Sequence, residues 1–90
     1  MERIDLIRTR LNDALSPNVL DIVDESHLHI GHAGAASGAG HFAVTVVSDK
    51  FKDCSALERH RLVYKAVDDL MQSEIHALSI KAFTSEEFNG

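Results

Sequence analysis

The stretch from residue 26 to residue 42 constrains the fold most, because it is too poor in large apolar side chains to form a core helix or a buried strand. It holds four of the chain's six histidines among glycines, alanines and serines. Its glycines allow backbone angles that other residues avoid. We therefore predict a long loop here, and loops longer than about 12 residues within a compact domain are usually functional or disordered.

The segments before and after this loop differ in their hydrophobic period. Apolar residues at helical spacing predict an amphipathic helix over residues 2–15, which Ser16-Pro17 ends. A short mixed run over 19–25 predicts a strand. The β-rich run over 41–48 carries almost no charge, so we predict a buried strand that pairs antiparallel with the first through the loop.

The second half of the chain repeats the alternation of helix and strand. Ser55 and Glu58 form a capping box that begins a helix, whose apolar pattern continues to Met71. Residues 75–83 alternate as a third strand does, with His76, Leu78 and Ile80 on one face. A second capping box over 84–87 predicts one terminal helical turn.

The predicted fold is α+β, an α-β-β-α-β order in two layers with a three-stranded sheet, as a single domain over 1–90. Cys54 is the only cysteine, which excludes an intrachain disulfide and indicates a reducing, cytoplasmic compartment. The charged first ten residues do not resemble a signal peptide. No apolar run approaches the roughly 18 residues of a membrane span, so we expect a soluble protein.

Five stretches of this sequence carry a resemblance to a known family. They are ESHLH at 25–29, LSP at 15–17, VVSDKF at 46–51, ERHRLVYKAV at 58–67 and IHALSIKAFTSEEF at 75–88. Together they resemble the BolA family over nearly the whole chain. The resemblance implies a mixed sheet in a fold similar to the type II KH domain, which agrees with the element order above.

The resemblance also implies a function that is not enzymatic. BolA-like proteins are adaptors that pair with monothiol glutaredoxins, either without a cofactor or sharing a 2Fe-2S cluster, and act in iron–sulfur maturation and iron regulation. The alternative is a DNA-binding transcription regulator, because some bacterial members are described as regulators of morphology and stress genes. We expect a bacterial, cytoplasmic adaptor that alone is a monomer or a weak homodimer.

The resemblance assigns the metal ligands to histidines. The glutaredoxin would supply a cysteine thiolate with a glutathione thiolate, and imidazole can replace thiolate on one iron, as in Rieske centres. His76 of the IHA motif matches the ligand that almost all members share. The second ligand comes from the loop between the first two strands, where ESHLH points to His29, with His32 and His27 as substitutes.

The residues themselves leave other interpretations open. His76 could be a partly buried histidine bonded to backbone. The loop histidines could chelate zinc, or the loop could be a soluble glycine-rich connector. His41 is more simply structural, and His60 and Cys54 lack the partners of a catalytic site.

The charge distribution bears on DNA binding. The net charge of −5 argues against a generic nucleic-acid binder, and residues 49–65, which sum to +2, are the only positive stretch. If DNA binds, five side chains of this basic strip should carry it, weakly and with strong salt dependence: Lys50, Lys52, Arg59, Arg61 and Lys65. The competing interpretation is that Arg59, His60 and Arg61 fix the helix against the sheet or contact a partner.

Overall fold

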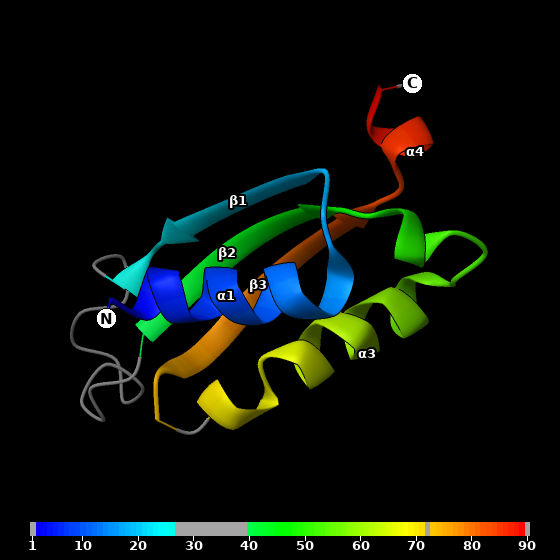
Figure 1. The fold of residues 1–90 in the computed structure, drawn as a ribbon. Coiled ribbons are helices and arrows are strands. Elements are labelled where there is room, and N and C mark those ends of the chain that lie inside the picture. The colour runs from blue at the N-terminus through cyan, green and yellow to red at the C-terminus, as the bar shows by residue number, and fades with distance from the viewer. Residues whose placement is uncertain (1, 27–39, 72, 90) are drawn as a thin grey trace.

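The computed structural model describes residues 2–26, 40–71 and 73–89 (Figure 1). The elements follow the predicted order. They are α1 (Arg3–Leu15), β1 (Val19–Asp24), β2 (Gly40–Val47), the 3₁₀ turn η2 (Asp49–Phe51), α3 (Ala56–Ala66), the 3₁₀ turn η3 (Asp68–Leu70), β3 (Ile75–Phe83) and α4 (Ser85–Asn89). None of the helices in these ranges is long and apolar enough to cross a membrane.

The sheet is mixed and has the strand order β1-β2-β3. β1 and β2 pair antiparallel, with Val19 opposite Val47 and Asp24 opposite Phe42. β2 and β3 run parallel, so the chain must cross over between them, and α3 lies in that crossover. The predicted two-layer α+β fold with a three-stranded mixed sheet is confirmed.

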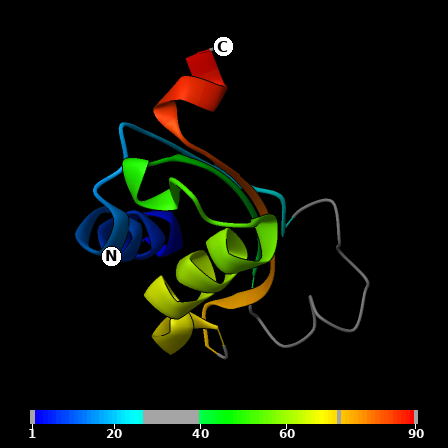
Figure 2. The same ribbon diagram turned by 90° about the vertical axis from the view of Figure 1, so that its right-hand side faces the viewer.

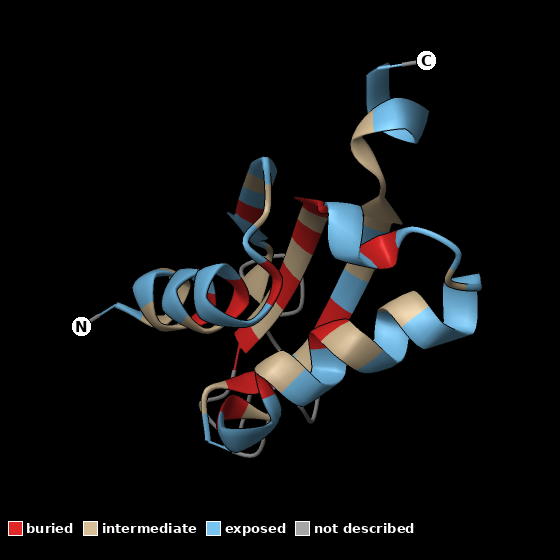
Figure 3. Cartoon of the chain, turned by 45° about the vertical axis from the view of Figure 1, so that its right-hand side comes forward, coloured by how far each residue is buried: buried red, intermediate tan, exposed pale blue. Residues whose placement is uncertain are grey.

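The two long helices, α1 and α3, lie side by side on one face of the sheet, and α4 projects from the far end of β3 (Figures 1 and 2). Alternate residues of β2 bury their side chains under these helices, as the bands of Figure 3 show. The core combines them with the apolar stripes of both helices; its most buried side chains are Ile7, Leu11, Phe42, Val44, Val46, Phe51, Val63, Val67 and Ile75. On the opposite face of the sheet Val47 is still only 1% exposed, and Phe83 of β3 packs against Phe88 of α4 with 5.8 Å between the ring centroids.

Both predicted capping boxes are present. Ser55 Oγ accepts the backbone N–H of Glu58, and the Glu58 carboxylate accepts the N–H of Ser55. Thr84 and Glu87 make the same reciprocal pair at α4. Each box satisfies backbone donors that a helix start would otherwise leave unpaired, which explains why these starts can be predicted locally.

The helix predicted to reach Met71 is shorter in the structure. α3 ends at Ala66, and Val67 leaves the helical region with φ −109° and ψ 15°. The chain continues as η3, where the N–H of Leu70 bonds to the carbonyl of Val67 at 2.8 Å. Val67 and Leu70 are nevertheless buried, so the apolar pattern that extended the prediction is real although the backbone changes.

Ser48 connects three elements, α1, β2 and η2. It is fully buried at the end of β2. Its Oγ donates to the Leu15 carbonyl at the end of α1, 2.6 Å away, and accepts the N–H of Lys50 in η2. This hydroxyl therefore ends one helix and begins a 3₁₀ turn.

Candidate metal centre

A β-bulge at the start of β3 determines where His76 points. Gly40 of β2 pairs with Ile75, but the next residue, His41, pairs with Ala77, so His76 is the extra residue. As a result Ile75 and Leu78 are both buried while His76 is exposed. The prediction that His76 shares a face with Leu78, and with it the interpretation of a partly buried structural histidine, is wrong because the bulge reverses the alternation there.

The bulge brings His76 beside a second histidine. The ring centroids of His41 and His76 lie 5.1 Å apart, with 47° between the ring planes. His41 is the second residue of β2 and is half-buried. Its backbone is held by Ser26, whose Oγ accepts the His41 N–H, and by Glu25, whose N–H donates to the His41 carbonyl.

The interpretation of His41 as merely structural therefore missed its contact with His76. A signal for this contact exists in the sequence, because β2 and β3 both carry a histidine at their second residue, and parallel pairing places strand starts together. The loop candidates His29, His32 and His27 lie outside the described residues.

The spacing of the His41–His76 pair fits coordination of one metal ion. Two imidazoles bound through nitrogens about 2.1 Å from a tetrahedral metal place their ring centres about 5 Å apart. Among the described residues, no group of three or more histidine, cysteine, aspartate or glutamate side chains could hold a metal ion. The pair can thus supply two nitrogen ligands on one side of a metal centre.

Arg59 of the basic strip is bound within the protein. Its Nη1 donates to the Ala82 carbonyl on β3 and its Nε to the Cys54 carbonyl. The guanidinium also forms a two-pronged pair with Glu87 of α4, with a shortest distance of 2.6 Å. The interpretation that this residue fixes α3 against the sheet is confirmed.

The Arg59 pair perturbs the titration of Glu87. Hydrogen bonds from Arg59 and from the Thr84 N–H lower the pKa of Glu87 to about 2, from 4.5. The same carboxylate raises the pKa of Arg59. The pair therefore remains charged across the physiological range and holds α4 at the end of β3.

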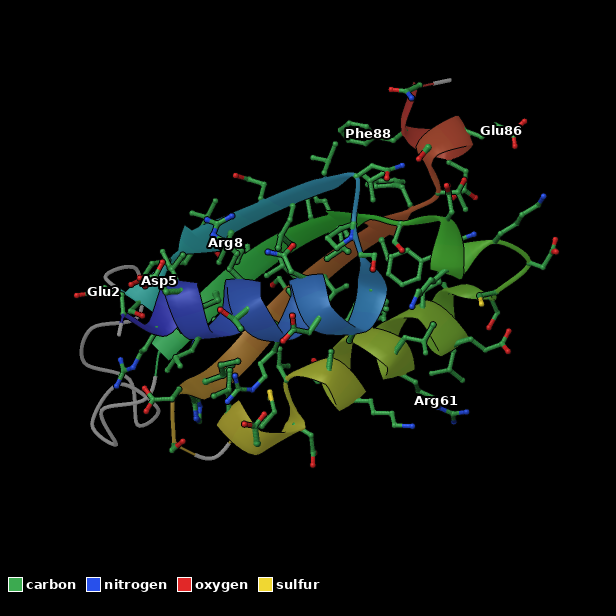
Figure 4. All side chains as sticks on the ribbon, viewed as in Figure 1. Glu2, Asp5, Arg8, Arg61, Glu86 and Phe88 are labelled. Atoms are coloured by element: carbon green, nitrogen blue, oxygen red, sulfur yellow. The ribbon has the colours of Figure 1, made fainter. Side chains whose placement is uncertain are left out.

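The other basic side chains are more accessible. Lys52, Arg61 and Lys65 are exposed, and Arg61 points away from α3 (Figure 4). Lys50 is exposed as well, and its Nζ donates to the Ala14 carbonyl. Cys54 is half-buried, with its thiol donating to the Lys50 carbonyl.

Comparison with known proteins identifies the family. A family model described as BolA-like protein matches residues 11–87. The chain belongs to the BolA-like family. Mouse BolA-like protein 1 is 44% identical over 82 residues, which cover 91% of this chain and 58% of the relative. The Escherichia coli DNA-binding transcriptional regulator BolA is 37% identical over 84 residues, covering 93% of this chain and 77% of the relative.

Solved structures agree with this BolA-like assignment. The BolA domain of SufE1 from Arabidopsis thaliana superposes with a TM-score of 0.85 at 39% identity, covering 97% of this chain and 96% of that one. Mouse BolA1 gives 0.80 at 40% identity, covering 99% and 70%. The chain spans 58% of the length of the mouse and human relatives that it matches, and its relatives come from mammals, a plant and bacteria.

Proposed function

We propose that this BolA-like chain is a non-enzymatic adaptor that binds a monothiol glutaredoxin and shares a 2Fe-2S cluster with it. The observation that carries the proposal is the exposed His76 ring beside His41. The bulge that turns the His76 imidazole out of the core interrupts the regular hydrogen bonding between β2 and β3. Bulges are over-represented beside functional sites. The exposed His76, with the half-buried His41 beside it, can meet a metal that another protein presents.

The ligand chemistry favours a shared centre. A 2Fe-2S cluster needs four protein or thiol ligands, and a monothiol glutaredoxin with glutathione supplies two thiolates to one iron. Two imidazoles from this chain complete the other iron, as in Rieske centres, and such nitrogen ligation raises the reduction potential of the cluster. The proposed output is iron–sulfur maturation or iron regulation.

His76 is the first proposed ligand, and the second has two sources. The resemblance favours His29 of the loop, with His32 and His27 as substitutes. The described structure adds His41, whose ring centre is 5.1 Å from that of His76. Replacing His29 and His41 separately by alanine distinguishes them, because loss of the true ligand shifts the visible circular dichroism of the cluster more than loss of its neighbour.

Co-purification tests the adaptor directly. The chain is reconstituted with a monothiol glutaredoxin, glutathione, ferrous iron and inorganic sulfide under reducing, anaerobic conditions, and the product is sized while its visible spectrum is recorded. We expect a coloured heterodimer with one cluster for each pair of chains. A colourless mixture, or colour that elutes with glutaredoxin alone, would overturn the proposal.

DNA binding is the second candidate, favoured by the printed names of the bacterial relatives, which are called DNA-binding transcriptional regulators. The exposed Lys52, Arg61 and Lys65 could contact phosphates, whereas Arg59 is committed to Glu87 and Ala82. Reversing the three exposed charges to glutamate should weaken binding about equally for all DNA sequences, as phosphate contacts do. Loss for one sequence alone would show base reading instead.

A further inference from the structure

The sheet gives the backbone around His76 little support. The bulge leaves His76 without a partner on β2, because Gly40 pairs with Ile75 and His41 pairs with Ala77. β3 is also an edge strand, so in the described part of the chain no strand flanks it on the side away from β2. The direction of the His76 ring therefore depends on how the residues before and after it are held.

Glu74 lies two residues before His76 and is bound to three other elements. Its N–H donates to the Leu70 carbonyl at the end of η3, 2.9 Å away, and its carbonyl accepts the N–H of Gly40 on β2. Its carboxylate Oε2 lies 2.9 Å from Nε of Arg3 in the first turn of α1. β3 and α1 begin at the same end of the molecule, which allows these two side chains to meet (Figure 1).

Arg3 is unfavourably placed for its own helix. The first turn of a helix carries a partial positive charge, so the helix dipole repels an arginine there. The side chains of Arg3 and Glu74 are 39% and 32% exposed, so water screens their attraction less than that of a fully exposed pair. The contact with Glu74, and not the stability of α1, explains a cation at this position.

Tyr64 of α3 holds β3 on the other side of His76. Its hydroxyl donates to the carbonyl of Leu78, two residues after His76, at 3.2 Å. The Tyr64 residue is 40% exposed, so burial alone does not explain where its ring lies. α1 and α3 thus each contribute one side-chain contact to β3, and the two contacts flank the bulge on either side.

We propose that Glu74 and Tyr64 are positioning residues for the metal centre, because they fix the bulge so that the His76 ring stays beside His41 and points outward. Neither side chain is itself a ligand. This inference rests on the proposed function, since it gives the exposed His76 imidazole the role of a ligand. Residues that orient a ligand contribute to metal affinity although they do not touch the metal.

Hydrogen exchange in the cluster-free chain measures the positioning without any partner. Glu74→Gln removes the charge and keeps the length of the side chain, and Tyr64→Phe removes only the hydroxyl. We expect the amides of residues 75–78 to exchange faster, by about two- to fivefold without the ion pair and by about two- to tenfold without the hydroxyl. The amides of β2 should keep their wild-type rates. Unchanged exchange at 75–78, or equal acceleration in both strands, would overturn the proposal.

Asp69→Asn is the matched control for Glu74→Gln. It removes one carboxylate charge from the Arg10–Asp69 pair, which also joins α1 to the segment between α3 and β3 but does not flank the bulge. The control should therefore leave exchange at residues 75–78 as it is in the wild type. An equal acceleration there in the control would show that any lost contact of α1 has this effect, and the proposal would be wrong.

Retention of the cluster gives the second readout, in the reconstituted heterodimer. Glu74→Gln and Tyr64→Phe should lose their visible absorbance to an iron chelator faster than the wild type by similar factors, whereas Asp69→Asn should match the wild type. The double variant Arg3→Glu/Glu74→Arg should regain most of the retention that Glu74→Arg alone loses. A double variant no better than Glu74→Arg, or single variants that hold the cluster as firmly as the wild type, would overturn the proposal. If the wild type forms no cluster, the proposed function fails, while hydrogen exchange still decides whether these two residues fix the bulge.

Discussion

Gly40 lies between the buried ring of Phe42 and the bulge that carries His76. It begins β2, pairs with Ile75 just before the bulge, and its N–H donates to the Glu74 carbonyl. A methyl group at this position would lie 2.7 Å from Cε2 of Phe42 and 2.7 Å from Oγ of Ser26. Both are far inside van der Waals contact, so Gly40→Ala requires a neighbour to move.

The expected cost follows from how firmly those neighbours are held. Phe42 is 1% exposed, so its ring has no free space into which it can turn. Overpacking of a core costs about 1–3 kcal/mol. Alanine regains about 0.5–1 kcal/mol of backbone entropy relative to glycine, so the net loss in the free energy of unfolding lies between about 0 and 2.5 kcal/mol, and the 2.7 Å contacts place our expectation in the upper half of that range.

Denaturant unfolding measures this loss, and a second substitution identifies its cause. Phe42→Leu removes Cε2 and Cζ, the ring atoms nearest the new methyl group. Gly40→Ala should therefore cost less in the Phe42→Leu background than in the wild type. An equal cost in both backgrounds, or a Gly40→Ala protein as stable as the wild type, would refute the steric reasoning.

Two further predictions concern buried and paired polar groups. Ser48→Ala should lower the free energy of unfolding by about 1–3 kcal/mol, because a fully buried hydroxyl that bonds Leu15 and Lys50 is lost, and chemical denaturation would show this as a lower midpoint. Glu87 should titrate near pH 2 by carboxyl NMR, and because its pKa is lowered from 4.5, its stabilisation of α4 is present above about pH 4.5 and is lost as the pH falls toward 2. Glu87→Gln should remove that pH dependence, and a normal titration midpoint in the wild type would contradict the Arg59 pairing.

Local sequence signals predicted the elements of this fold well. The capping boxes at Ser55 and Thr84 involve residues three apart, so each helix start depends on nothing distant. The antiparallel pairing of the first two strands is confirmed as well. The end of α3 was placed too late because a 3₁₀ turn keeps Val67 and Leu70 buried, and the period of apolar residues cannot distinguish the two backbones over so short a stretch.

The candidate site was harder to predict because its geometry comes from pairing between distant strands. The bulge at His76 is a property of the β2–β3 register, in which Ile75 pairs with Gly40 and Ala77 with His41. Strict alternation along one strand places His76 on the wrong face. Likewise no residue near Arg59 in the sequence indicates its contacts with Ala82 and Glu87. Arg59 was assigned to the basic strip only because its side chain is positively charged.

Reconstitution of the cluster with His76→Ala tests the central claim most directly. His76 is exposed, so its loss should leave the far-ultraviolet circular dichroism unchanged and preserve binding of the cluster-free glutaredoxin. His60→Ala is the matched control, because it removes an exposed histidine that lies on α3 and not beside His41. We predict that His60→Ala forms the coloured heterodimer with the wild-type visible spectrum, whereas His76→Ala fails to hold the mixed-ligand cluster. A wild-type cluster spectrum in the His76→Ala heterodimer would contradict the account.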